Sequence, residues 1–182
     1  CQSYSYDPVT YTYTFTLRSG VTFSDGSALT AADVAATLRR AQTSPRYSAR
    51  LARVASISAG DGAVTVSLSS ANTGFPALLD IPIVKSGTET SLTPVGTGPY
   101  VLATDAGGAC LTARDGWWGD GSRPVDRITL STARDWDSLL YHFSSHDIQL
   151  ITADLTGTDP ITATGNISYV DADTTVLQYV GF

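Results

Sequence analysis

The sequence predicts an α+β fold, with mixed α/β character, in which strands and helices follow one another irregularly. Three observations carry this prediction. Residues 11–17 alternate aromatic or aliphatic side chains with threonine, the period of a half-buried strand. Residues 30–41 change to a helical period, and residues 54–68 return to two alternating runs separated by Gly60-Asp61-Gly62, a hairpin pattern.

Composition and charge narrow the classes of function. Hydrophobic residues make up 42% of the 182 residues and charged residues only 15%, a balance that suits a secreted or cell-surface protein. The net charge of −6 argues against nucleic acid as a partner, because phosphate binding needs clustered Lys and Arg side chains. No run of about eighteen apolar residues occurs, so the sequence predicts no membrane-spanning helix.

The first elements are a strand, a turn and a capped helix. In the turn at 24–27, Gly26 can adopt a positive φ. Thr30 is placed to cap the helix, and the Asp33 carboxylate can reach back toward the cap backbone. We expect the helix to bury the face that carries Val34, Leu38 and Ala41.

The later elements are shorter. Pro76 favours a short helix at 75–79, and Pro82 limits 81–84 to an edge or irregular strand. The small polar residues of 85–93 are typical of a linker, so we predict two subdomains, residues 1–93 and 94–182. The second is expected to hold a helix at 134–144 and strands at 101–102, 110–114, 125–130, 148–151, 168–170 and 175–180.

Several stretches form motifs that occur together in one family. The first half contains YTFTLR at 13–18, Asp25-Gly26 and LTAADV at 29–34, and the second contains PVGTGPY at 94–100, WWG at 117–119 and PVDRI at 124–128. Together they resemble the extracellular solute-binding proteins of ABC importers, in particular the peptide- and nickel-binding family 5. The pattern departs at His146 and Gln149, where relatives carry the Gly and Asp of a Gly-Glu-Ile-Asp segment.

The resemblance implies both fold and function. The fold would be a periplasmic-binding-protein-like type II lobe with mixed sheets and flanking helices. The lobe would end near the hinge, and the second lobe would be absent from this sequence. The function would be that of a substrate-binding component that captures oligopeptides, dipeptides or a similar small solute outside the cell and delivers them to ABC permease subunits. The protein would be a monomer without enzyme activity or cofactor, extracytoplasmic, and lipid-anchored in its full-length form.

Two segments near the hinge line the ligand cleft in relatives. On this sequence they correspond to the loop after residues 148–151 and to the strand at 175–180. The resemblance implies that Asp154 meets a ligand ammonium group, while Gln178 and Tyr179 supply hydrogen bonds and an aromatic wall. The complete set of expected ligand-binding residues is Thr152, Asp154, Thr175, Gln178 and Tyr179.

Two alternatives remain open. Trp117 and Trp118 could form a platform for a sugar ring in a stand-alone carbohydrate-binding or adhesion module, although core packing at a turn is the favoured interpretation. His142 and His146 stand four residues apart on a predicted helix, a spacing that suits nickel or metal-chelate binding. Because a helix end favours histidine in any case, we predict no metal site here.

No catalytic constellation is present. The sequence lacks a Gly-x-Ser-x-Gly elbow, and its histidines lie far from any distinctive Ser or Cys. Residues 96–98 lack the Lys and the following helix of a phosphate-binding loop, so we interpret them as a turn between subdomains. We therefore predict no catalytic residues.

The two cysteines are too far apart in sequence for a metal or redox motif, and a disulfide between Cys1 and Cys110 stays open. Cys1 would suit the lipidated start of a bacterial lipoprotein. A strand follows almost at once, however, so we interpret Cys1 as the boundary of a processed chain.

Overall fold

The computed structural model describes residues 1–119, 125–152, 167, 168 and 170. The chain divides into two compact units, Cys1–Leu130 and Ser131–Phe182. Each is described by itself. Within the described residues no helix is both long enough and apolar enough to cross a bilayer.

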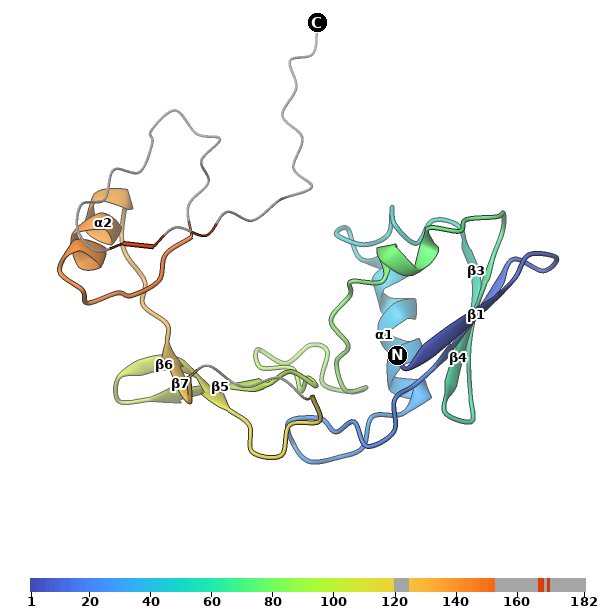
Figure 1. Ribbon diagram of the computed structural model, residues 1–182, viewed down its shortest axis with the longest axis horizontal. Coiled ribbons are helices and arrows are strands. Elements are labelled where there is room, and N and C mark those ends of the chain that lie inside the picture. Colours follow the sequence, from blue (N-terminus) through green and yellow to red (C-terminus); the bar gives the residue numbers. More distant parts are fainter. Residues whose placement is uncertain (120–124, 153–166, 169, 171–182) are drawn as a thin grey trace, which may run out of the picture. The chain divides into compact units, whose positions relative to one another are not determined.

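A four-stranded antiparallel sheet dominates the first unit (Figure 1). Its strands, in spatial order, are β1 (Ser3–Asp7), β2 (Thr12–Thr16), β4 (Ala63–Leu68) and β3 (Val54–Gly60). The predicted strand at 11–17 and the hairpin at 54–68 are thus both present. Gly62 turns the hairpin with a φ of 68°, a conformation that favours glycine.

The inner face of this sheet packs against α1 (Ala31–Thr43) to form the core. The sheet contributes Tyr13, Phe15, Val64 and Val66, and the helix contributes Ala35 and Leu38, all of them buried. As predicted, Leu38 and Ala41 are buried, while Val34 is only partly so.

The N-terminus of α1 has the capping box that the sequence predicts. The backbone N–H of Asp33 donates to the Thr30 hydroxyl at 3.3 Å, and the Thr30 N–H donates to the Asp33 carboxylate at 3.0 Å. The Asp33 carboxylate also accepts from the Ser86 N–H at 3.1 Å, so it fixes residue 86 to the start of the helix.

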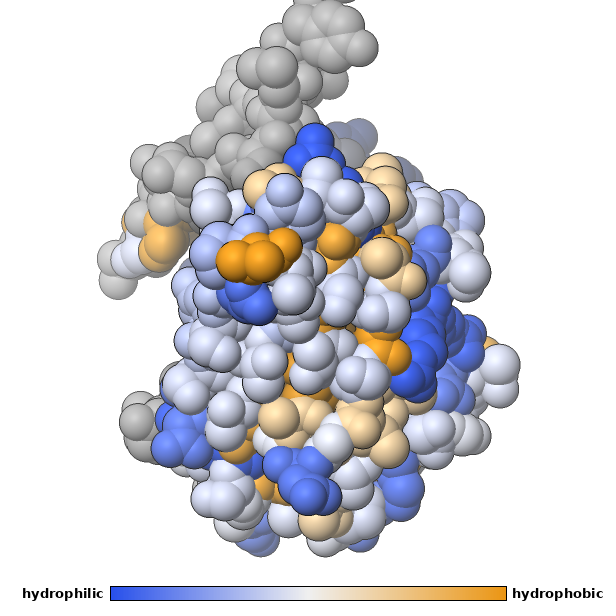
Figure 2. All heavy atoms as spheres, turned by 90° about the vertical axis from the view of Figure 1, so that its right-hand side faces the viewer, coloured by the Kyte–Doolittle hydropathy of each residue, from blue (hydrophilic) through white to orange (hydrophobic). Residues whose placement is uncertain are grey.

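The outer face of the same sheet consists mostly of hydroxyl side chains. One row crosses all four strands, because Ser5 pairs with Thr14, Thr14 with Thr65, and Thr65 with Ser58. Figure 2 views the molecule from this side, where pale colours of intermediate hydropathy predominate.

A second antiparallel sheet follows in the same unit. Its order is β5 (Tyr100–Asp105), β6 (Gly108–Ala113) and β7 (Arg127–Thr129). Between the two sheets in sequence come the short helix η1 (Phe75–Leu78), whose Phe75 is buried, and an isolated bridge between Val84 and Gly96. The predicted subdomain boundary at 93/94 separates the two sheets in sequence, and both belong to the first compact unit.

Both cysteines are free thiols. Cys1 is exposed, whereas Cys110 on β6 is 0% exposed. The structure therefore contains no Cys1–Cys110 disulfide.

The second unit contains α2 (Trp136–Ser144), which Asp135 caps by accepting from the Ser138 N–H at 2.8 Å. The predicted strand at 148–151 is wrong, since these residues form no strand and Leu150 is 82% exposed. A strand needs a neighbour to pair with, and the described residues of this unit contain none. Ser168 is likewise not in a strand, and residues 175–180 lie outside the described residues.

Candidate functional site

The sequence motifs of the first unit meet around one buried arginine. Arg114, at the end of β6, is only 8% exposed. Its guanidinium donates to the Phe23 carbonyl at 2.8 Å, to the Thr22 hydroxyl at 3.0 Å, and to the carbonyls of Thr22 and Gly98 at 3.2 Å. All of these partners are neutral. Arg114 therefore ties residues 22 and 23, which lead into the 24–27 turn, to the 96–100 turn and both to the second sheet.

Two tryptophans fasten the same junction. The indole N–H groups of Trp117 and Trp118 both donate to the Thr97 carbonyl, at 3.0 and 2.8 Å. A side chain at Gly119 would collide with the Trp117 ring, so only glycine fits there. Because both indole donors are used internally, the pair could offer a sugar only its ring faces.

Charged contacts fix the neighbouring segments. Lys85 forms an ion pair of 2.5 Å with Asp25, and the Ser24 N–H donates to the Gly96 carbonyl at 2.9 Å. The Lys85 ammonium, with further hydrogen bonds from Ser27, holds the pKa of the Asp25 carboxyl well below its usual range. The Asp25-Gly26 motif thus serves to dock this turn.

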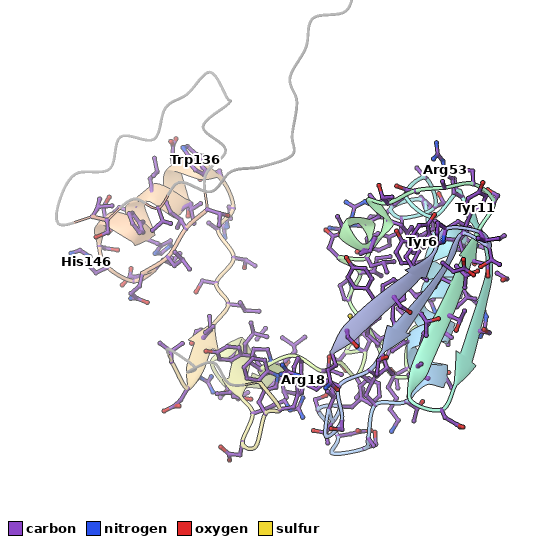
Figure 3. All side chains as sticks on the ribbon, turned by 45° about the vertical axis from the view of Figure 1, so that its right-hand side comes forward. Tyr6, Tyr11, Arg18, Arg53, Trp136 and His146 are labelled. Atoms are coloured by element: carbon purple, nitrogen blue, oxygen red, sulfur yellow. The ribbon has the colours of Figure 1, made fainter. Side chains whose placement is uncertain are left out.

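An apolar groove opens beside the junction within the first unit. It has a volume of about 460 Å³ and is lined by side chains from β2, α1 and residues 76–83. Its polar lining includes Arg18, Thr97 and the indole of Trp118. The Arg18 guanidinium lies 5.4 Å from the centre of the Trp118 ring, and Trp118 contacts Thr97, so these three residues form one polar corner. Figure 3 places Arg18 at the end of the sheet away from Tyr6 and Tyr11.

The structure does not bring together the residues expected to bind ligand. Thr152 is exposed and lies outside any helix or strand of the second unit. Asp154, Thr175, Gln178 and Tyr179 lie outside the described residues, so their role stays a prediction.

The predicted placement of two histidines on one helix face is wrong. Helix α2 ends at Ser144, and His146 follows it with a φ of 64°, in the left-handed region. His142 Nδ1 instead lies 3.2 Å from the Asp147 carboxylate. Hydrogen bonds from Ser145 and then His142 lower the pKa of that carboxyl. No group of three metal-ligating side chains occurs among the described residues.

Sequence reasoning missed Arg18 and Arg114. Arg114 directly follows the strand Gly108–Ala113 and precedes the aromatic loop. A charged side chain beside an apolar loop needs hydrogen-bond acceptors if it is to be buried, and this requirement is the signal that could have identified it. Arg18 belongs to the YTFTLR motif, but its partner Trp118 lies a hundred residues away and is visible only in the structure.

Solved structures of solute-binding proteins share this fold. Matching solved structures include NikA from Staphylococcus aureus in complex with Ni(L-His)2, with a TM-score of 0.67 and 24% identity over 80% of this chain and 32% of that one. They also include the oligopeptide-binding protein AppA from Bacillus subtilis in complex with a nonapeptide, with a TM-score of 0.66 and 22% identity over 81% of this chain and 33% of that one. At these identities the likeness shows the fold alone.

Sequence comparison gives the family. Residues 1–182 match the bacterial extracellular solute-binding proteins, family 5 Middle, and the chain belongs to this family. Protein XP55 of Streptomyces lividans is 40% identical over 68% of this chain and 25% of its own length. Glutathione-binding protein GsiB of Salmonella typhi is 32% identical over 68% of this chain and 27% of its own length. The chain thus spans about a quarter of the length of these curated relatives.

Proposed function

We propose that this chain is part of a substrate-binding protein that captures a peptide or a similar small solute outside the cell and presents it to an ABC permease. The observation that carries the proposal is the family match over all 182 residues. A small polar solute is the expected substrate, because the relative GsiB is named as a glutathione-binding protein and two solved structures of the same fold contain nickel-histidine or a nonapeptide.

A protein of this kind works by closing two lobes over its ligand, so that the site loses its water only when both lobes meet. In such a closure the first unit would move as one body, because the junction around Arg114 ties its two sheets together. We assign ligand contacts to Asp154 and Tyr179, with Thr152, Thr175 and Gln178 beside them. Hydrogen bonds to the ligand main chain would then allow varied peptide side chains.

The test is native mass spectrometry of the protein purified without denaturation, repeated after denaturation. We expect a small-molecule mass that is lost on denaturation and that fragments as a peptide. A protein with no bound solute, which also fails to bind dipeptides and glutathione, would refute the proposal.

Variants test the assigned residues. Asp154→Asn and Tyr179→Ala should each weaken solute affinity by about tenfold or more. Asp61→Asn, in the hairpin turn between β3 and β4, is the matched control and should leave affinity unchanged. If both cleft variants bind as tightly as the control, the ligand lies elsewhere.

The carbohydrate-binding alternative gives a different result. It requires retention on immobilised polysaccharide, and this retention should disappear when Trp117 and Trp118 are replaced.

A further inference from the structure

The sequence contains four Asp-Gly dipeptides, at residues 25–26, 61–62, 115–116 and 120–121. An aspartate followed by glycine is prone to isomerisation, because glycine has no side chain to keep its backbone nitrogen away from the preceding carboxyl group. The first three pairs lie within the described residues. Their different surroundings decide which of them can react.

Isomerisation proceeds through a cyclic imide. The glycine nitrogen attacks Cγ of the aspartic acid, an N–Cγ bond forms, and the carboxyl hydroxyl leaves as water together with the amide proton. Water then opens the ring at one of its two carbonyls and yields either aspartate or isoaspartate, in which the main chain runs through Cβ and Cγ. The reaction needs a protonated carboxyl group, because an ionised one is a poor electrophile, and a glycine N–H that no acceptor holds.

The Asp25-Gly26 pair is closed to this reaction. The Gly26 N–H donates to the Phe23 carbonyl at 3.0 Å, so the attacking nitrogen is held. The Asp25 carboxylate forms an ion pair with Lys85 and accepts from the Ser27 hydroxyl at 2.6 Å. The Lys85 ammonium, and then the Ser27 contacts, lower the pKa of the Asp25 carboxyl, so this group stays ionised. Both requirements are therefore missing while the turn is docked.

The Asp61-Gly62 pair is open. Both residues are exposed, and Gly62 has a φ of 68°. Within the part of the chain that the structure describes, the Asp61 carboxylate forms no hydrogen bond or ion pair, and the Gly62 N–H has no acceptor. The turn follows β3, the outermost strand of its sheet, so its local opening costs little.

The pair at 115–116 is held more firmly. Its residues are exposed, but they lie between Arg114 and Trp117, whose side chains both donate to carbonyls of the 96–100 turn. These two anchors resist the backbone rotation that ring closure requires.

We infer that Asp61-Gly62 is the isoaspartate-forming site of the first unit, and that the Lys85 contact protects Asp25-Gly26 from the same reaction. The product would lengthen the turn between β3 and β4 by one main-chain carbon. It would also displace the Gly62 carbonyl, which accepts from the Leu17 N–H at 2.8 Å. Solute binding plays no part in the reaction, so the inference does not depend on the proposed function.

The test incubates the native protein, and the same protein unfolded in guanidinium chloride, in warm buffer at mildly acidic pH. Peptide mapping with an endoprotease that cleaves before aspartate, but not before isoaspartate, follows each pair separately. We expect the 61–62 pair to isomerise at similar rates in both samples. The 25–26 pair should react at least about tenfold more slowly in the native protein than in the unfolded chain, because it reacts only when the turn opens.

Variants separate the two parts of the inference. Lys85→Met should raise the native rate of the 25–26 pair by about threefold or more and leave the 61–62 pair unchanged. Arg50→Met is the matched control, because Arg50 also forms an exposed ion pair, with Asp80, which no glycine follows. It should change neither rate. Asp61→Glu should abolish the signal at 61–62, since glutamate would have to form a larger ring, and it disturbs no described contact.

Two results would overturn the inference. One is a native protein in which the 61–62 pair is protected as strongly as the 25–26 pair, which would show that this turn is closed. The other is equal isomerisation of the 25–26 pair in the Lys85→Met and Arg50→Met variants, which would show that Lys85 protects nothing.

Discussion

Replacing Arg114 by methionine should destabilise the first unit strongly, although the change removes a charge from the interior. Methionine keeps most of the aliphatic stem and deletes all guanidinium donors. The Thr22 carbonyl then loses its described partner, whereas the Phe23 carbonyl keeps a hydrogen bond from the Gly26 N–H at 3.0 Å. The Gly98 carbonyl also loses its guanidinium partner.

The magnitude follows from these acceptors. Thr22 is only partly buried and Gly98 is exposed, so water can reach both carbonyls, and what is lost is mainly the hydrogen bonds to a charged group, which contribute about 1.5–3 kcal/mol each. Relief from burying an unpaired cation offsets part of the sum. We expect a loss of about 2–3 kcal/mol. At a urea slope of roughly 2 kcal/mol/M, the unfolding midpoint should fall by about 1 M without a change in slope.

Tryptophan fluorescence provides the assay. Trp117 and Trp118 lie in the same unit as Arg114, while Trp136 lies in the other, so Trp136→Phe gives a background that reports on the first unit alone. Arg127→Met is the matched control, because Arg127 forms an exposed ion pair with Asp105, and exposed ion pairs contribute little to stability. If Arg114→Met shifts the midpoint no more than Arg127→Met does, the junction does not hold the unit together.

Three further predictions follow from local contacts. Asp33→Ala should lower the free energy of unfolding in urea by about 1–2 kcal/mol, because it removes the capping box and the acceptor for the Ser86 N–H. Asp61→Ala, in an exposed turn, should leave it almost unchanged. Equal effects of the two variants would contradict the role of the cap. The pKa of Asp25 is lowered in the folded protein, so its contribution to stability is present above about pH 4 and is lost as the pH falls. Unfolding measured from pH 5 down to pH 2 should therefore depend less on pH in Asp25→Asn, and an unchanged slope would show that the Lys85 contact contributes nothing. His146→Gly should stabilise α2 by up to about 1 kcal/mol, measured by amide hydrogen exchange, because glycine adopts the left-handed conformation of residue 146 without strain. His142→Gly, inside the helix, should destabilise α2 by about the same amount. Faster exchange in His146→Gly would show that residue 146 is not strained.

The sequence was most informative where structure depends on near neighbours. The Thr30–Asp33 cap, the Gly26 turn and the hairpin turned by Gly62 are each decided within a few residues, and the structure confirms them. The departure from the family pattern that the sequence indicates at His146 falls at a residue with a positive φ in the structure. What the sequence alone did not show is that the helix ends before His146.

The rest depends on partners distant in sequence. Arg114 binds mainly backbone carbonyls, and a carbonyl has no signature of its own in a sequence. The 148–151 segment has strand-like residues, but a strand forms only where another strand is placed beside it. The polar corner of the groove forms only where Arg18, which follows β2 in the first sheet, contacts Trp118, which follows β6 in the second.

Lys85 is the only lysine in the sequence, and its ammonium is held by Asp25. Within these 182 residues amine-reactive reagents therefore have a single side-chain target, and that target lies in the contact that docks the 24–27 turn. Acylation of Lys85 would neutralise the cation and release the turn. The rate at which Lys85 is labelled thus reports on whether the turn is docked. Attaching the protein to a surface through Lys85 would break the Lys85–Asp25 contact.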